Sequence, residues 1–169
     1  FNPRVSKGLY RPDIDGLRGL AVLVVIFFHY GVPGFTGGFV GVDIFFVISG
    51  YLITQILISG LEGPFFSLRV FYERRVRRIL PALLTVISAV MLWSLISQSP
   101  FSARDTAQSV FASTLFLSNI LYISESANYF GIDSELKPLL HTWSLSLEWQ
   151  YYMVFPVLLL LTLRLNQKV

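Results

Sequence analysis

The sequence predicts an all-α fold, a polytopic bundle of transmembrane helices, and two observations carry this prediction. First, 54% of the 169 residues are hydrophobic and 14% are charged, a balance typical of a lipid-embedded chain and not of one soluble core. Second, several nearly uncharged runs have about the 20 residues that a helix needs to cross the hydrocarbon core of a bilayer. Cysteine is absent, which excludes disulfides, thiol catalysis and zinc–thiolate sites.

We expect the first membrane span at residues 16–32. Three basic residues stand among the first eleven positions, and this excess of positive charge predicts a cytoplasmic amino terminus. A short turn containing glycine and proline follows at 31–34. The second span, 35–59, is interrupted by a single charged residue, Asp43, and returns the chain to the cytoplasm.

The segment 64–78 that follows is strongly basic. It holds five arginines against one acid, Glu73, and also has an apolar side, so it predicts a helix lying in the inner membrane interface. Residues 79–98 carry no charge and form the clearest span. The net charge of +3 comes from this clustering of arginines, which favours a cytoplasmic face or anionic lipid as partner and not nucleic acid.

Two more spans are predicted at 106–124 and 142–163, which makes about five. The fourth is uncharged but rich in Ser and Thr, and the fifth contains one acid, Glu148. Five alternating crossings from a cytoplasmic start would place Arg164 and Lys168 outside, against the usual preference of positive charge. Either further spans of a longer protein set the orientation, or the segment 106–124 is re-entrant.

Arg18 and His29 are the candidate functional residues of the first predicted span. Eleven helical steps of about 100° return to nearly the same face, so the two side chains share one stripe about 16 Å long. Ionisable groups at membrane depth usually serve a function. His29 could accept a proton from a hydroxyl and return it, or it could be a hydrogen-bonded structural residue near the outer interface.

Three acids could assist these residues. Asp15 lies three residues before Arg18, and such a pair could bind a phosphate or polarise a carbonyl; alternatively, Arg18 extends to the inner headgroups. The intramembrane acids Asp43 and Glu148 are expected to have partners. An Asp43–His29 contact would orient the imidazole, but Asp43 could equally cap the second helix.

The basic run is the candidate surface for a polyanionic ligand. Guanidinium groups bind phosphate bidentately, so coenzyme A would fit, or the same charges could set topology by binding acidic lipid. The run consists of Arg69, Arg74, Arg75, Arg77 and Arg78. A group of aromatic residues in the last span is interpreted first as an aromatic belt at the membrane interface. Its members are Trp143, Trp149, Tyr151 and Tyr152.

Four segments distributed along the chain form recognisable motifs. They read YRPDIDGLRGLAVLVVIFFHY, GGFVGVDIFFVISGYLIT, FYERRVRRILPALL and LLHTWSLSLEWQYYMVFP. In this order and spacing they resemble the integral membrane acyltransferase family 3, the O-acetylases of bacterial surface sugars, and several motifs together are far more specific than any one. The resemblance extends from Tyr10 to about Leu163.

The resemblance implies particular site residues. Arg18 and His29 match the family's arginine and histidine, and Arg75 and Arg78 match its paired arginines ahead of the next span, with Arg74 and Arg77 beside them. Glu148 falls in the Trp-Ser-Leu-Ser-x-Glu motif. The family usually continues with Glu-Gln-Phe-Tyr, whereas this chain has Trp149 and Tyr151 at the first and third of those positions, which affects the local packing.

The resemblance also implies the architecture and the reaction. Members have about ten spans, so residues 1–169 correspond to the amino-terminal part of a transmembrane acyltransferase domain, and the first residue, Phe1, likewise suggests a longer protein. The full protein would move an acetyl group from acetyl-CoA, with no tightly bound cofactor and no metal, to a hydroxyl of a cell-surface or lipid-linked glycan such as lipopolysaccharide or peptidoglycan. It would act in the bacterial inner membrane.

In the implied mechanism the paired arginines hold the coenzyme phosphates and Arg18 orients the thioester. His29 acts as general base on the acceptor or briefly carries the acetyl group, while Asp43 and Glu148 are orienting partners. A different class of function remains open from the residues alone, namely a transporter whose ionisable stripe relays protons or ions.

Overall fold

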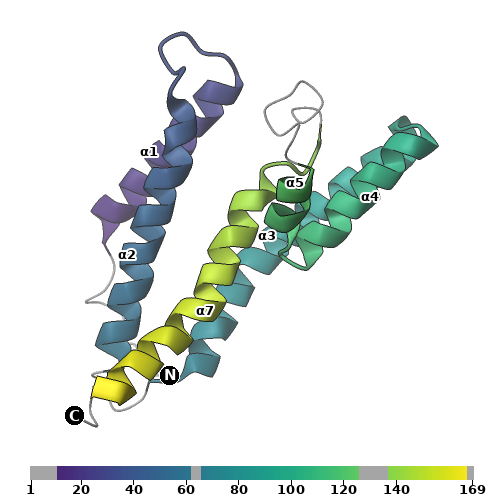
Figure 1. Ribbon diagram of the computed structural model, residues 1–169. Helices are drawn as coiled ribbons and strands as arrows, with labels where there is room; N and C mark the ends of the chain where they lie inside the picture. Colours follow the sequence, from purple (N-terminus) through teal and green to yellow (C-terminus); the bar gives the residue numbers. More distant parts are fainter. Residues whose placement is uncertain (1–10, 62–65, 126–136, 167–169) are drawn as a thin grey trace. The chain divides into compact units, whose positions relative to one another are not determined.

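The computed structural model describes residues 11–61, 66–125 and 137–166, and this part of the chain is helical and contains no strand. The chain divides into two compact units, Phe1–Phe66 and Ser67–Val169. Each unit is described separately below, and Figure 1 labels their helices. The predicted all-α class is confirmed.

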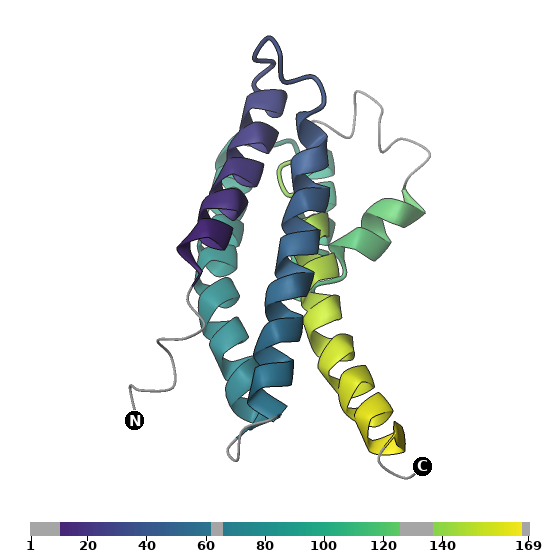
Figure 2. The same cartoon turned by 90° about the vertical axis from the view of Figure 1, so that its left-hand side faces the viewer.

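The first unit is a helical hairpin. Helix α1 (Pro12–His29) and helix α2 (Gly41–Leu61) lie side by side and run in opposite directions, as Figures 1 and 2 both show. The single-turn 3-10 helix η1 (Gly38–Val40) leads into α2. The predicted turn between them is present, and its glycines Gly31 and Gly34 adopt φ angles of 63° and 91°, which a residue with a Cβ rarely adopts.

Two glycines allow the helices of this hairpin to approach closely. A Cβ added at Gly38 would lie 2.4 Å from the carbonyl oxygen of Val24, and one at Gly41 would lie 2.5 Å from that of Ala21. These distances are far below van der Waals contact with backbone atoms that cannot move cheaply. Gly38 and Gly41 therefore serve helix packing, a role that small residues commonly have in membrane proteins.

The second unit begins with a single long helix, α3 (Leu68–Ser97). It joins the predicted basic interfacial helix to the third predicted span, so the expected boundary at residues 78–79 is not formed. Pro81 lies inside α3, where it removes one backbone donor without ending the helix. At 1.5 Å per residue, 30 residues extend about 45 Å, more than the roughly 30 Å of hydrocarbon.

The fourth predicted span is not one helix. Helix α4 (Pro100–Thr114) ends in a Schellman turn, in which the amide of Leu117 donates to Ala112 at 2.8 Å and that of Phe116 donates to Ser113 at 3.1 Å. Phe116 occupies the left-handed position with a φ of 54°, where glycine is usual. The chain then continues as the short helix α5 (Ser118–Ser124), so a straight crossing by 106–124 is excluded.

The last helix, α7 (Thr142–Asn166), contains the fifth predicted span and tolerates Pro156 in its interior. A chain of hydroxyls that is buried except at the half-buried Thr142, and which we call the hydroxyl seam, joins it to α4 and α5. Neighbouring oxygens are 2.7–3.1 Å apart along the seam. Its members are Ser113, Thr142, Ser118 and Ser146.

A pair of side-chain amides also joins α5 to α7, close to the turn between α4 and α5. Gln150 of α7 and Asn119 of α5 donate to each other at 3.0 Å, and the Gln150 amide also donates to the carbonyl oxygen of Phe116 at 2.9 Å. The Phe116 ring stacks on Trp149, with centroids 4.6 Å apart. The unusual backbone at Phe116 is therefore held from two sides by α7.

Three helices in the described part of the chain are long and apolar enough to cross a membrane. They cover Gly38–Leu61, Leu68–Ser97 and Thr142–Leu163. Helix α1 has 18 residues but carries Asp13, Asp15 and Arg18, which makes it more polar than these three. The multi-pass prediction is confirmed, whereas the count of about five spans is not.

Candidate functional site

Arg18 is positioned by both helices of the hairpin. It is half-buried on α1, and its guanidinium carbon lies 4.7 Å from the ring centroid of Phe45 on α2, a cation–π contact. Among the described residues, its buried Nε atom has no hydrogen-bond partner. The expected Asp15–Arg18 ion pair is not formed in this part of the chain. Arg18 is thus a half-buried cation with donor capacity for an anionic or carbonyl group.

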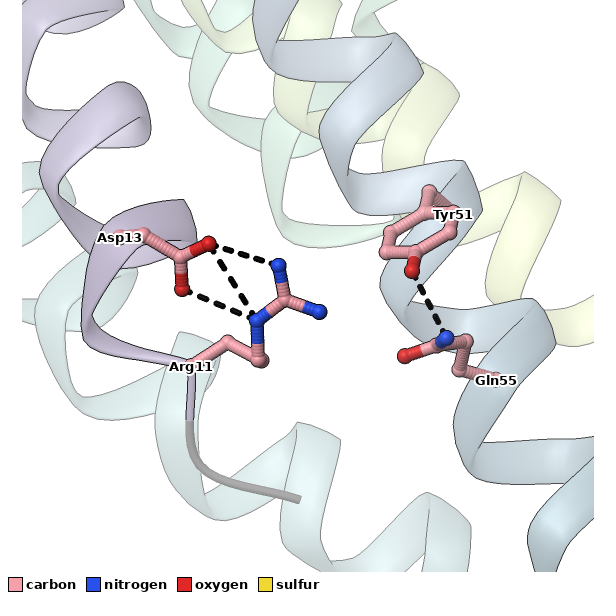
Figure 3. A network of polar contacts seen from close by, with 4 residues as sticks. All are labelled: Arg11, Asp13, Tyr51 and Gln55. Carbon is pink, nitrogen blue, oxygen red and sulfur yellow. Dashed lines mark hydrogen bonds and ion pairs between the residues drawn. The ribbon is translucent and has the colours of Figure 1, made fainter.

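The acid that does form an ion pair near the start of α1 is Asp13. Its carboxylate accepts hydrogen bonds from Nε of Arg11 at 3.0 Å and from an amino nitrogen at 2.6 Å, as Figure 3 shows. This hydrogen-bonded pairing lowers the pKa of Asp13 and raises that of Arg11. Across from it on α2, Gln55 donates to the hydroxyl of Tyr51 at 2.7 Å. Asp15, the predicted partner of Arg18, is an exposed residue.

His29 is the last residue of α1, and its tautomer follows from one contact. Its Nδ1 lies 2.8 Å from the carbonyl oxygen of Val25, one turn earlier on the helix. Because a carbonyl can only accept, Nδ1 carries the proton in this hydrogen bond. Neutral His29 therefore has its lone pair on Nε2, the atom that would act as a base. The side chain itself is exposed, with the Phe28 ring 5.1 Å away edge-on.

Asp43 does not reach His29. It lies in the first turn of α2, is exposed, and forms no ion pair within the described residues. An acid in a first turn interacts favourably with the positive end of the helix dipole. The position therefore agrees with the alternative in which Asp43 stabilises the start of the helix, and the expected imidazole contact is not present.

Glu148 lies in a buried cluster of the second unit. It is 8% exposed on α7 and accepts a hydrogen bond from the hydroxyl of Tyr152, one turn further along the same helix. The ring of Tyr152 is itself 5.8 Å from the guanidinium carbon of Arg75 on α3, which also lies 5.6 Å from the Phe71 ring. The cluster thus contains a carboxylate, a phenol and a cation from two helices.

The predicted arginine set divides into two groups. Arg75 is half-buried in the cluster with Glu148, and Arg69 is exposed near the start of α3. Three further arginines are exposed together later on α3. We call these three the exposed arginine face, which consists of Arg74, Arg77 and Arg78. Arg77 pairs with Glu73 at 2.7 Å. The structure therefore separates a surface suited to phosphate groups from one arginine that faces α7.

The prediction from sequence missed Tyr152 and Tyr72. Tyr72 donates to the carbonyl oxygen of Met153 at 3.2 Å and so joins α3 to α7 beside the cluster. The sequence did contain a signal for Tyr152, because a residue four positions after Glu148 lies on the same helix face. The described residues contain no group of three His, Cys, Asp or Glu side chains that could hold a metal ion.

Comparison with known proteins identifies the family. The family model described as "Acyltransferase domain" matches residues 11–169, nearly the whole chain. The chain belongs to this acyltransferase family. Membership favours an enzyme over the transporter that the ionisable residues alone left open.

Two curated relatives from Staphylococcus aureus illustrate the similarity. "Putative O-acetyltransferase SAS0844" of strain MSSA476 is 40% identical over 98% of this chain and 28% of its own length. "O-acetyltransferase OatA" of strain NCTC 8325 / PS 47 is 40% identical over 94% of this chain and 25% of its own length. The chain therefore spans about a quarter of the length of these relatives. No solved structure matches.

Proposed function

We propose that the full-length protein containing this chain is a membrane O-acetyltransferase that moves an acetyl group from acetyl-CoA to a hydroxyl of a cell-surface or lipid-linked glycan. Membership of the acyltransferase family and the names of the O-acetyltransferase relatives support the reaction class. The three apolar helices support a site within a membrane. A bacterial inner membrane and a cytoplasmic amino terminus agree with the basic residues ahead of α1.

The observation that carries this proposal is the contact of 2.8 Å between Nδ1 of His29 and the carbonyl oxygen of Val25. A neutral imidazole with its proton on Nδ1 presents a basic Nε2, which is what proton abstraction from a sugar hydroxyl requires. As the hydroxyl oxygen attacks the thioester carbonyl, its proton passes to Nε2, the acyl C–O bond forms and the C–S bond breaks. The imidazolium then returns the proton to the departing thiolate of coenzyme A.

Arginines and acids of both units have proposed roles in binding the donor and in stabilising charge. The Nε donor of Arg18 has no partner among the described residues, and its guanidinium lies against the Phe45 ring. Arg18 can therefore orient the thioester carbonyl and stabilise the negative charge that develops there. The exposed arginine face can hold the coenzyme phosphates, and Arg75 lies next to it on α3. Glu148 completes the proposal as an orienting acid in its buried cluster, whereas Asp43, which does not contact His29, stabilises the start of α2.

Donor dependence tests the proposal. Inside-out membrane vesicles containing the full-length protein receive acetyl-CoA labelled in the acetyl group, and mass spectrometry measures label in glycan esters. We expect label transfer that requires the protein and saturates with donor concentration. Absence of label in esters, with intact protein in the vesicles and acceptor present, would refute the proposed reaction.

A further inference from the structure

The buried acid of α7 presents an energetic problem that the protein must solve. A carboxylate that is 8% exposed loses nearly all of its water, and its charged form is costly unless donors and positive charge replace that water. The residues around Glu148 therefore determine whether its charged form is stable and how its carboxylate is oriented. Contacts within the second unit identify Tyr152 and Arg75 as two such residues.

Tyr152 is the neighbour that controls the direction. It is 3% exposed, and its hydroxyl donates to Oε1 of Glu148. The two residues stand one turn apart on α7, so the hydrogen bond is local and keeps its geometry when other parts of the protein move. A donor that is itself fixed in the core restricts the carboxylate to one orientation.

Arg75 is the cation that contacts the ring of Tyr152. Its guanidinium lies over the Tyr152 ring at 5.8 Å and over the Phe71 ring at 5.6 Å. A cation near an aromatic face draws electron density from the ring, which makes the phenolic O–H a stronger donor. The positive charge of α3 thus acts on the carboxylate of α7 through the phenol. The Tyr72–Met153 hydrogen bond keeps the two helices together at this point.

We propose that Tyr152 is a positioning residue for acyl transfer, which orients the Glu148 carboxylate through its hydroxyl while Arg75 strengthens that hydrogen bond across the ring. This inference rests on the proposed function and adds to it a residue that acts through another. Tyr152 is not an interfacial anchor, because its side chain is buried and its hydroxyl is used inside the protein.

The first test is a mutant cycle in the full-length protein, with acetyl-CoA as the probe. Tyr152→Phe keeps the ring and the cation–π contact and removes only the donor. We expect kcat to fall roughly ten- to hundredfold, as the loss of a hydrogen bond to a charged group predicts, with KM for acetyl-CoA unchanged. Because Tyr152 acts through Glu148, Tyr152→Phe should have no further effect on kcat in a Glu148→Gln background.

Tyr151→Phe is the matched control. Tyr151 is half-buried on the same helix and stacks on Phe155 at 4.8 Å, so loss of its hydroxyl should leave kcat unchanged. If the Tyr152→Phe and Glu148→Gln effects on kcat multiply independently, or if Tyr152→Phe retains full kcat, the positioning role is refuted.

A second readout separates this inference from the proposed function. The infrared carboxyl band that disappears in Glu148→Gln should shift in Tyr152→Phe and stay in place in Tyr151→Phe, whether or not the protein transfers acetyl groups. An unshifted band overturns the inference. If the band shifts in Tyr152→Phe but the wild-type protein moves no acetyl group from acetyl-CoA, the Tyr152–Glu148 contact is established and the proposed function is refuted instead.

Discussion

Substituting Gly41 by alanine is expected to separate the two helices of the first unit. The new Cβ would lie 2.5 Å from the carbonyl oxygen of Ala21 and 2.7 Å from a methyl group of Val25. Ordinary van der Waals contact begins near 3.4 Å, so the helices must move apart by about 0.9 Å at this point. Overpacking of this kind costs about 1–3 kcal/mol. The roughly 1 kcal/mol by which alanine favours a helix over glycine applies to helix interiors, and Gly41 is the first residue of α2, so little of it offsets this cost.

The assay is unfolding in mixed micelles by increasing detergent denaturant, with Gly19→Ala as the matched control. Nothing lies within 4 Å of a Cβ at Gly19 on α1, so that variant should be as stable as the wild type or slightly more stable. We expect Gly41→Ala to unfold at a lower denaturant fraction and to lose acetyl transfer, because α1 carries Arg18 away from Phe45. Equal stability of the two alanine variants would refute the packing argument.

Three further predictions concern other parts of the chain. Gln150→Leu removes three hydrogen bonds and should cost about 2–4 kcal/mol by the same unfolding assay, whereas Gln55→Leu, which loses one local bond, should cost less than about 1 kcal/mol. Arg18→Lys should retain more transfer activity than Arg18→Ala, because lysine keeps the charge; equal loss in both would argue against an electrostatic role. Neutralising the exposed arginine face should weaken acetyl-CoA binding strongly at low salt and little near 1 M salt, and an unchanged affinity at low salt would leave those arginines a role in lipid binding or topology.

The apolar runs predicted most of the long helices, because a segment that crosses a membrane is recognised by its length and its lack of charge. Helix α7 contains the predicted span 142–163, while α2 and α3 cover most of the predicted spans 35–59 and 79–98. The boundary at residues 78–79 was not predictable, because a basic interfacial segment and the start of a spanning helix have the same local pattern. Helix continuity through Pro81 shows that one missing backbone donor does not end a long helix.

The break in the fourth predicted span depends on distant residues. Phe116 adopts the left-handed conformation without being glycine, so no local signal marks it. Such a conformation costs about 1–3 kcal/mol and persists only where surrounding structure holds it. Here Trp149 stacks on the ring and Gln150 bonds the carbonyl, and both belong to a helix that begins 26 residues later.

In the candidate site, too, some features follow from local sequence and others depend on distant residues. That Arg18 and His29 share a helix follows from spacing, and the structure confirms that one helix carries both. Their environments do not follow from spacing, since Phe45 comes from another helix. The contacts considered between Asp15 and Arg18 and between Asp43 and His29 are not formed, which favours the alternatives left open for these acids. Sequence reasoning treated Tyr152 as one of several belt aromatics because burial is invisible in a composition count.

Acetyl transfer by His29→Ala is the most direct test of the proposed mechanism. The measurement is the rate of label transfer from acetyl-CoA to glycan esters by the full-length protein, normalised to folded protein. The matched control is Tyr30→Ala, since Tyr30 is 82% exposed and adjacent in the chain. Removal of a general base predicts a loss of at least about a hundredfold in His29→Ala, with Tyr30→Ala close to wild type. Transfer by His29→Ala at the wild-type rate would contradict the account.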